Sequence, residues 1–259
     1  MKQTQTLYPV VFVGAGPGDP ELITVKGRNA LEDADFVVYA GSLVPEALLK
    51  WTQPSCRKLS SASMHLDEII SAIDTAHRDG LKVVRLHTGD PSLYGAVFEQ
   101  MTALQEKGIP YRVIPGVTAA FAAAAALGIE YTLPQVSQTL ILTRMAGRTP
   151  VPERENLAAL AAHRTSMAVY LSVHLVEQMA DTLMQSYGAS APCVVVYRVS
   201  HPEERIVWTT IDRLVKTVEE ENITRQALVI VGEVLRAGRS MSPQPSKLYD
   251  KHFSHGFRK

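Results

Sequence analysis

The sequence has little of several things that mark a chain's environment or partners. It holds two cysteines, Cys56 and Cys193, too far apart to form a C-x-x-C pair, so we expect packing residues of a reduced protein, not a disulfide framework. Lys and Arg number 26, as do Asp and Glu, so no net charge attracts nucleic acid or an anionic membrane. The stretch closest to a membrane span, the Ala-rich residues 119–127, is far shorter than the ~20 apolar residues a span needs. With no apolar signal segment at the N-terminus, we expect a soluble, cytoplasmic protein.

The first glycine-rich loop lacks what a phosphate-binding loop needs. Residues 10–13 (Val-Val-Phe-Val) predict a buried strand, and Gly14-Ala15-Gly16-Pro17-Gly18-Asp19-Pro20 follows. Asp19 stands where a dinucleotide motif needs its third glycine, and no Gly-Lys-Ser/Thr follows. Pro17 and Pro20 also remove backbone N–H donors. The loop therefore predicts close approach to a ligand that is not a phosphate anion, which disfavours a nicotinamide dehydrogenase.

The first half of the chain alternates strands with helices. The apolar patterns predict strands at 10–13, 35–39, 82–87 and 111–114, and helices at 21–31, from Leu66 to Gly80 and from Val97 to Gly108. This alternation predicts a mostly parallel, doubly wound sheet. The loops after the strands, at 14–20, 40–45, 88–95 and 115–118, would then share the edge where such sheets bind ligands.

The second half has a different pattern. An Ala-rich helix at 119–127 precedes expected strands at 139–143, 167–171, 193–199, 206–208 and 227–234, with helices near 153–162 and after Ser172 and Thr210, two good N-caps. The turn 201–204 predicts an antiparallel hairpin. We expect two α/β domains, 8–117 with a mostly parallel sheet and 118–240 with a mixed sheet, a tail at 241–259, and an active site in the cleft between the domains.

Several ordered motifs together resemble the tetrapyrrole methylase family. They are Val-Gly-Ala-Gly-Pro-Gly-Asp-Pro-Glu-Leu at 13–22, Thr-Gly-Asp-Pro-Ser-Leu-Tyr-Gly at 88–95 and Pro-Gly-Val-Thr-Ala at 115–119. Within the family, 39–44, 64–66, 143–152 and the tail from Lys247 are similar to the branch that methylates C11 of precorrin-4 or cobalt-precorrin-4 in cobalamin synthesis. The resemblance implies two-domain, homodimeric enzymes that transfer a methyl group from S-adenosyl-L-methionine to a tetrapyrrole, leaving S-adenosyl-L-homocysteine.

The resemblance also implies site residues. The family's cofactor contacts fall on Pro17, Thr88, Gly89, Asp90, Leu93, Tyr94, Thr118, Ala119, Leu171, Val199 and Ala227. Candidate substrate contacts are Ser42, Met64, His65, Arg144 and Arg148, the two arginines because the substrate carries many carboxylates. Arg85, Arg112 and Arg198 are further candidates. Asp90 has an equally good structural interpretation, as the cap of a helix beginning near Ser92.

One departure from the family concerns acid–base chemistry. Uroporphyrinogen methylases of the family carry an Asp after the second-strand Tyr and a Lys about two dozen residues later. This chain has Ala40 and the stretch 59–63 (Leu-Ser-Ser-Ala-Ser) instead. We therefore assign no catalytic acid or base, and we expect a substrate whose carbon is already nucleophilic. We also assign no metal site, because His252 and His255 have no third ligand in view.

Other interpretations remain open from the sequence. The chain could be another methylase of the same pathway, or a scaffold that binds a tetrapyrrole without turnover. Methylases of ribosomal RNA or of a modified histidine share the fold, but a pI near 7.1 disfavours an RNA target. The sequence does not decide whether the substrate holds cobalt.

Overall fold

The computed structural model describes residues 7–237, 246, 252–254 and 256. The chain divides into two compact units after Ala122, and each unit has a five-stranded sheet. This division falls within helix α4 (Ala119–Leu127). No helix in the described ranges is long and apolar enough to cross a membrane. The expected tail, 241–259, lies mostly outside the described residues.

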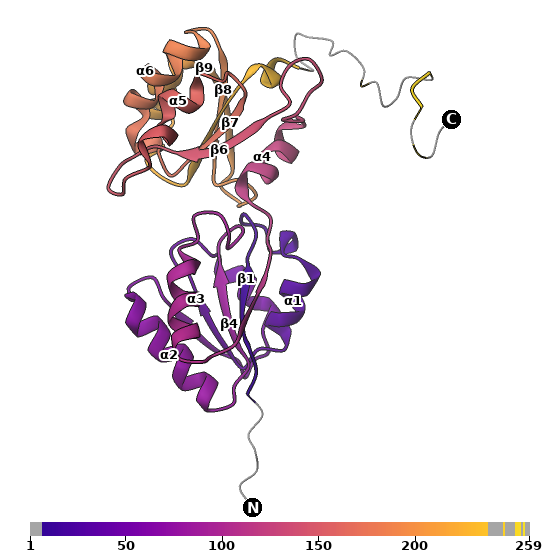
Figure 1. Cartoon of the computed structure of the whole chain (residues 1–259), viewed down its shortest axis with the longest axis vertical. Coiled ribbons are helices and arrows are strands. Elements are labelled where there is room, and N and C mark those ends of the chain that lie inside the picture. The colour runs from indigo at the N-terminus through magenta and orange to yellow at the C-terminus, as the bar shows by residue number, and fades with distance from the viewer. Residues whose placement is uncertain (1–6, 238–245, 247–251, 255, 257–259) are drawn as a thin grey trace, which may run out of the picture. The chain divides into compact units, whose positions relative to one another are not determined.

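The first unit holds a sheet in which every strand pair is parallel. Its order is β3(Arg57–Ser60), β2(Phe36–Tyr39), β4(Val83–His87), β1(Val10–Gly14) and β5(Tyr111–Ile114). Since parallel strands need crossover connections, helices cover both faces. Helix α1(Val25–Glu32) lies on one face, and α2(Leu66–Arg78) and α3(Val97–Glu106) lie on the other (Figure 1).

Strand β1 shows how the sequence builds this core. Val11 and Val13 pack into the cluster on the α1 side, whereas Val10 and Phe12 pack into the cluster on the α2 and α3 side. All four are buried, as expected for a central strand whose successive side chains point to opposite faces. The expected doubly wound first domain is confirmed.

Two local expectations for this unit were wrong or incomplete. The expected helix at 21–31 is a 3₁₀ turn at Pro20–Leu22 followed by α1, which begins at Val25 because the Thr24 side chain accepts a hydrogen bond from the Gly27 N–H at 3.1 Å. Strand β3, preceded by the 3₁₀ helix Glu46–Trp51, had no apolar pattern to reveal it.

The second unit holds a mixed sheet. Its order is β6(Leu140–Arg144), β7(Ser166–Tyr170), β10(Ala227–Val231), β8(Pro192–Tyr197) and β9(Arg205–Thr210). Only the β6–β7 pair is parallel, and the expected hairpin is confirmed as β8 and β9. Helices α5(Leu157–Ala161), α6(Val176–Tyr187) and α7(Leu214–Glu220) supply residues to a single core cluster with one face of this sheet.

Helical segments begin after Ser172 and Thr210 as expected, and both residues stand at N-cap positions, but neither side chain makes a capping hydrogen bond. Each is followed by a short 3₁₀ helix, Val173–Leu175 and Ile211–Arg213, before the α-helix begins. The Ser172 hydroxyl accepts a hydrogen bond from the Met145 N–H at 2.8 Å and donates to the Tyr170 carbonyl. The Thr210 hydroxyl donates to the Asp212 carboxylate. Both side chains therefore hold loops together and do not cap a helix.

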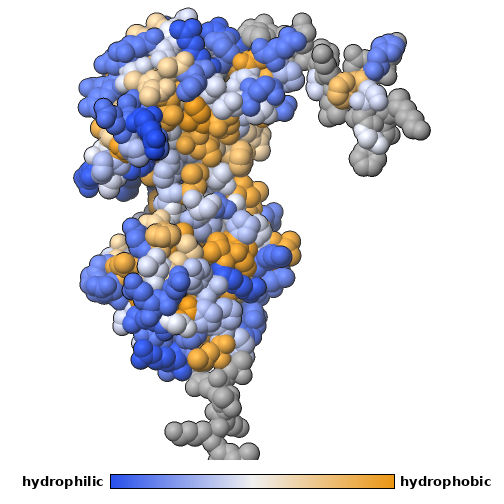
Figure 2. Space-filling view, viewed as in Figure 1, coloured by the Kyte–Doolittle hydropathy of each residue, from blue (hydrophilic) through white to orange (hydrophobic). Residues whose placement is uncertain are grey.

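The surface and the cysteines fit a packed protein. On the face seen in Figure 2, hydrophilic side chains cover most of each unit and apolar ones gather in separate areas.

Cys56 and Cys193 are buried and free. Burial raises the pKa of both thiols, that of Cys193 to about 12, so both are unreactive packing residues, as expected.

Candidate functional site

The loops at the carboxyl ends of β1, β4 and β5 approach one another backbone to backbone. A Cβ added to Gly116 would lie 2.1 Å from the Gly89 carbonyl oxygen, and one on Gly14 would lie 2.5 Å from the Gly116 nitrogen. The backbones of Gly16 and Gly89 also exchange two hydrogen bonds, at 3.2 and 2.8 Å. These glycines are needed for contact between loops, an explanation that the sequence motif alone did not provide.

Asp90 links two of these loops. Its Oδ1 accepts hydrogen bonds from the Ser92 N–H and hydroxyl, and its Oδ2 accepts one from the Gly116 N–H at 2.8 Å. Burial works to raise the pKa of this carboxyl, but the hydrogen bonds from Ser92 and Gly116 hold the pKa below its usual range. The expected cap of a helix near Ser92 was wrong, because α3 begins at Val97.

Strained backbone occurs after one strand of each unit. Tyr94 and Ala96, after β4, have φ values of 54° and 46°, and Leu171, after β7, has a φ of 55°. Tyr94 is 42% exposed and Leu171 is 59% exposed. Non-glycine residues held in the left-handed region cluster at ligand sites, so the loop after β4 and the loop after β7 are each a candidate for ligand contact.

The expected cofactor residues of the first unit share one sheet edge. Since β1, β4 and β5 run parallel, the loops after them lie at the same end of the sheet. The structure therefore brings together the residues that follow these strands, namely Pro17, Thr88, Gly89, Asp90, Leu93, Tyr94, Thr118 and Ala119.

The expected cofactor residues of the second unit also share one edge. Strand β10 is antiparallel to both β7 and β8, and β6 is parallel to β7. The start of β10, with Ala227, therefore lies beside the ends of β7 and β8. Leu171 follows β7, and Val199 follows β8. Arg144, at the end of β6, belongs to this edge as well.

A cavity of about 550 Å³ opens at the carboxyl ends of β2 and β4. Ser42, an expected substrate contact, lines it together with Ala40 and Leu43 from the loop after β2. Polar groups on its wall come from β4 and α3, namely Arg85, His87, Glu99 and Gln100. From the sequence, Arg85 was named as a further candidate but His87 was missed, although a histidine in a buried strand was a visible signal.

Arg85 and His87 are both only 4% exposed. Arg85 donates from Nε to Gln100 Oε1 at 2.9 Å and from Nη1 to the Val38 carbonyl at 3.2 Å, and burial lowers its pKa to about 10. His87 lies against Phe12 with 6.0 Å between ring centroids. Burial, and then the charge of Arg85, lower the His87 pKa to about 3, so at neutral pH the cavity wall holds one cation and one neutral imidazole.

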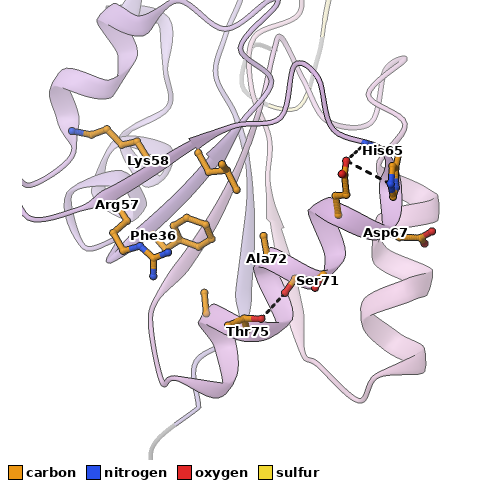
Figure 3. A pocket seen from close by; sticks show the side chains of 11 residues that line it. Phe36, Arg57, Lys58, His65, Asp67, Ser71, Ala72 and Thr75 are labelled. Carbon is orange, nitrogen blue, oxygen red and sulfur yellow. Dashed lines mark hydrogen bonds and ion pairs between the residues drawn. The ribbon is translucent and has the colours of Figure 1, made fainter.

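Of the other substrate candidates from this unit, Arg85 lines the same cavity, whereas His65 and Met64 lie apart from it. His65 is at the start of α2 and lines a different groove, between β3 and α2, with Arg57 and Phe36 on the other side (Figure 3). Its backbone N–H donates to Glu68 Oε2 at 3.0 Å, while its side chain is 68% exposed. Met64 packs, partly buried, against the core cluster on the α2 face. Of Ser42, Met64 and His65, only Ser42 lines the cavity after β2 and β4.

The two candidate arginines of the second unit differ in their surroundings. The guanidinium of Arg144 donates to the carbonyls of Met145, Thr149 and Pro150, the last at 2.7 Å. It therefore holds its own loop in shape. Arg148 is exposed in the same loop, where its charge faces solvent.

The two sheets with their helices define an α/β protein, and comparison with known proteins identifies its family. Residues 9–215 match the family model "Tetrapyrrole (Corrin/Porphyrin) Methylases". The chain belongs to the tetrapyrrole methylase family.

Individual relatives match over nearly the whole chain. A cobalt-precorrin-4 C(11)-methyltransferase of Methanocaldococcus jannaschii is 49% identical, covering 96% of each chain. A precorrin-4 C(11)-methyltransferase of Pseudomonas aeruginosa is 47% identical, covering 96% of this chain and 98% of the relative.

Solved structures agree with this assignment. The structure of a cobalt precorrin-4 methyltransferase has a TM-score of 0.85 at 44% identity, over 87% of this chain and 95% of that one. A uroporphyrin-III C-methyltransferase of Thermus thermophilus, complexed with S-adenyl homocysteine, has a TM-score of 0.74 at 29% identity. The match covers 88% of this chain and 94% of that one.

Proposed function

We propose that this protein is an S-adenosylmethionine-dependent methyltransferase that methylates C11 of precorrin-4, or of its cobalt form, in cobalamin biosynthesis. The observation that carries the proposal is similarity at 44–49% identity, over most of the chain, to proteins named for that reaction. Relatives named with and without cobalt are almost equally similar, so the proposal includes both forms of the substrate.

The strand-end residues suit the methyl donor. The loops after β1, β4 and β5 provide uncharged backbone, and Asp90 is already committed to Ser92 and Gly116. The exposed side chains of Tyr94 and Leu171 offer apolar surface to an adenosyl group. We propose that these residues, with Pro17, Thr88, Gly89, Leu93, Thr118, Ala119, Val199 and Ala227, hold the cofactor.

Methyl transfer of this kind requires mainly that the protein align the methyl donor with the tetrapyrrole carbon. When bound, S-adenosylmethionine supplies a methyl group on a sulfonium, an electrophile that no acid or base need activate. The tetrapyrrole carbon is electron-rich, and Ala40 lines the cavity where uroporphyrinogen methylases carry an Asp. The residues of this chain therefore orient two ligands and exclude water, and positioning of this kind can contribute several kcal/mol. We further propose that Met64, His65 and Arg148 contact the substrate.

The test is mass spectrometry of the tetrapyrrole after incubation with the purified protein and methyl-labelled S-adenosylmethionine. We expect precorrin-4 or its cobalt form to gain one labelled methyl group. Binding of both ligands with no gain in mass would mean that the protein is a tetrapyrrole carrier. We also propose a cytoplasmic homodimer, and light scattering on the purified protein tests the dimer.

A further inference from the structure

The cavity after β2 and β4 has an unusual wall. The guanidinium of Arg85 is buried, and within the described residues its hydrogen bonds go to neutral groups: the Gln100 side chain and the carbonyls of Val38 and Leu86. No ion pair joins Arg85 to a carboxylate within the described residues. A buried cation without a counter-ion destabilises the folded protein unless an anion or further hydrogen-bond acceptors compensate its charge.

His87 is a second buried polar residue among those that line this cavity. The Nε2 of its ring is buried without a hydrogen-bond partner in the described part of the chain. Leaving such a nitrogen unsatisfied costs free energy in the free protein. A ligand that accepts a hydrogen bond in this cavity would recover that cost.

The charge balance of the cavity favours an anion. Glu99 is the one carboxylate among the lining residues, and it is exposed, so water screens its charge. Arg85 is buried, so its positive charge acts through a low-dielectric wall. The imidazole of His87 is neutral and can donate one N–H. A carboxylate can accept hydrogen bonds from both Arg85 and His87.

We propose that this cavity seats a carboxylate side chain of the tetrapyrrole, with Arg85 providing the buried positive charge and His87 donating the hydrogen bond. The inference rests on the proposed function for the identity of the ligand. The carboxylate of the methyl donor is the other possible source, but the residues expected to hold the cofactor, such as Thr88 and Thr118, do not line the cavity. The tetrapyrrole candidate Ser42 does.

The experiment uses uroporphyrin III, a stable tetrapyrrole octacarboxylate, with binding followed by fluorescence. His87→Phe removes the hydrogen-bonding group while keeping a ring against Phe12. We expect its affinity for uroporphyrin III to fall about ten- to a hundredfold, the effect of losing a hydrogen bond to a charged group. Because the free protein loses an unsatisfied nitrogen, its melting temperature should stay the same or rise.

The chain offers a matched control. His77 on α2 is also 4% exposed, its Nε2 is also buried without a partner in the described residues, and it does not line the cavity. His77→Phe should leave uroporphyrin III affinity unchanged. His87→Gln, which keeps a neutral N–H donor, should recover most of the affinity lost in His87→Phe. Arg85→Met should weaken binding at least tenfold.

The outcomes separate the alternatives. Equal affinity of His87→Phe and His77→Phe for uroporphyrin III overturns the inference, as does a wild-type protein that binds S-adenosylhomocysteine but no uroporphyrin III. Weaker S-adenosylhomocysteine binding by His87→Phe, with uroporphyrin III unaffected, assigns the cavity to the cofactor and also overturns it. If wild-type protein fails to methylate precorrin-4 but His87→Phe still loses uroporphyrin III, the proposed function fails and the carboxylate site stands.

Discussion

At the scale of single residues, three glycines permit the crossing of the strand-end loops. Gly14, Gly89 and Gly116 lie so close that any Cβ on Gly14 or Gly116 would meet backbone atoms well inside 3 Å. Backbone atoms cannot rotate away as a flexible side chain can. The geometry of these strand-end loops therefore depends on glycine at positions 14 and 116, where the backbones come into contact.

Gly116→Ala tests this dependence. Overpacking against backbone costs about 1–3 kcal/mol and occasionally more. The matched control is Gly108→Ala, where a Cβ meets nothing within 4 Å and only the positive φ of 68° is strained, at about 1–2 kcal/mol. Denaturant unfolding should show a larger loss for Gly116→Ala, together with weaker S-adenosylhomocysteine binding. Equal losses and unchanged binding would contradict the close crossing.

Asp90 makes part of the stability acid-sensitive. Its folded pKa is lowered by the hydrogen bonds from Ser92 and Gly116 although burial opposes this. Because the folded pKa lies below the unfolded one, the stabilisation is present above the unfolded value and is lost as the pH falls through the folded one. Asp90→Asn should therefore be less stable than wild type at neutral pH, and the difference should shrink below about pH 4. A difference independent of pH would exclude this role of the carboxylate.

His87 predicts a second pH dependence, over a different range. Its folded pKa of about 3 lies below the ordinary ~6.5, so the unfolded chain binds more protons between these values. Stability should fall as the pH falls from about 6.5 towards 3, with up to ~1.4 kcal/mol per pH unit from this group. His87→Phe should show a flatter profile over this range in urea titrations. An unchanged slope would mean that His87 is protonated in the folded protein.

At the scale of elements, the loop after β6 is shaped by its own arginine. Arg144 bonds three carbonyls of residues 145–150, while Arg148 is exposed. Both arginines were expected to bind substrate carboxylates. In the structure Arg144 binds its own loop, whereas the charge of Arg148 is exposed.

Two alanine variants separate the roles of Arg144 and Arg148. Arg148→Ala should weaken tetrapyrrole binding about ten- to a hundredfold and leave both loop protection and S-adenosylhomocysteine affinity unchanged. Arg144→Ala should also weaken tetrapyrrole binding, but with faster hydrogen exchange and proteolysis at 145–150. Equal protection of the loop in both variants would contradict the shaping role of Arg144.

The elements also show what the sequence could and could not predict. Buried strands such as β1 and β10 are runs of apolar residues rich in Val, so local pattern was enough to find them. Strand β3 carries exposed Arg57 and Lys58, and its pairing with β2 depends on a distant part of the chain. The same holds for the site: the Asp90–Gly116 bond spans 26 residues, so Asp90 looked like a local helix cap.

At the scale of the whole molecule, the proposed mechanism is catalysis by alignment of the two ligands. Within the described residues lining the cavity, the only titratable side chains are Arg85, His87 and Glu99. His87 is neutral at working pH because its pKa is lowered to about 3. A base contributes 10²–10⁴-fold, so the absence of one has a measurable consequence.

Three variants test that consequence. His65→Ala, Ser42→Ala and Tyr94→Phe should each lower single-turnover methylation by less than about a hundredfold at saturating ligands. The rate should also show no steep limb near the ordinary histidine pKa of ~6.5. A loss of a thousandfold or more in any variant that still binds both ligands would reveal a protein acid or base.

The most direct measurement is the position of the transferred methyl group. Precorrin-4 or its cobalt form is incubated with the purified protein and S-adenosylmethionine labelled with ¹³C in its methyl group, and the product is analysed by NMR. The account predicts one labelled methyl group, bonded to C11. A label on another carbon, or no transfer while both ligands are bound, would contradict it.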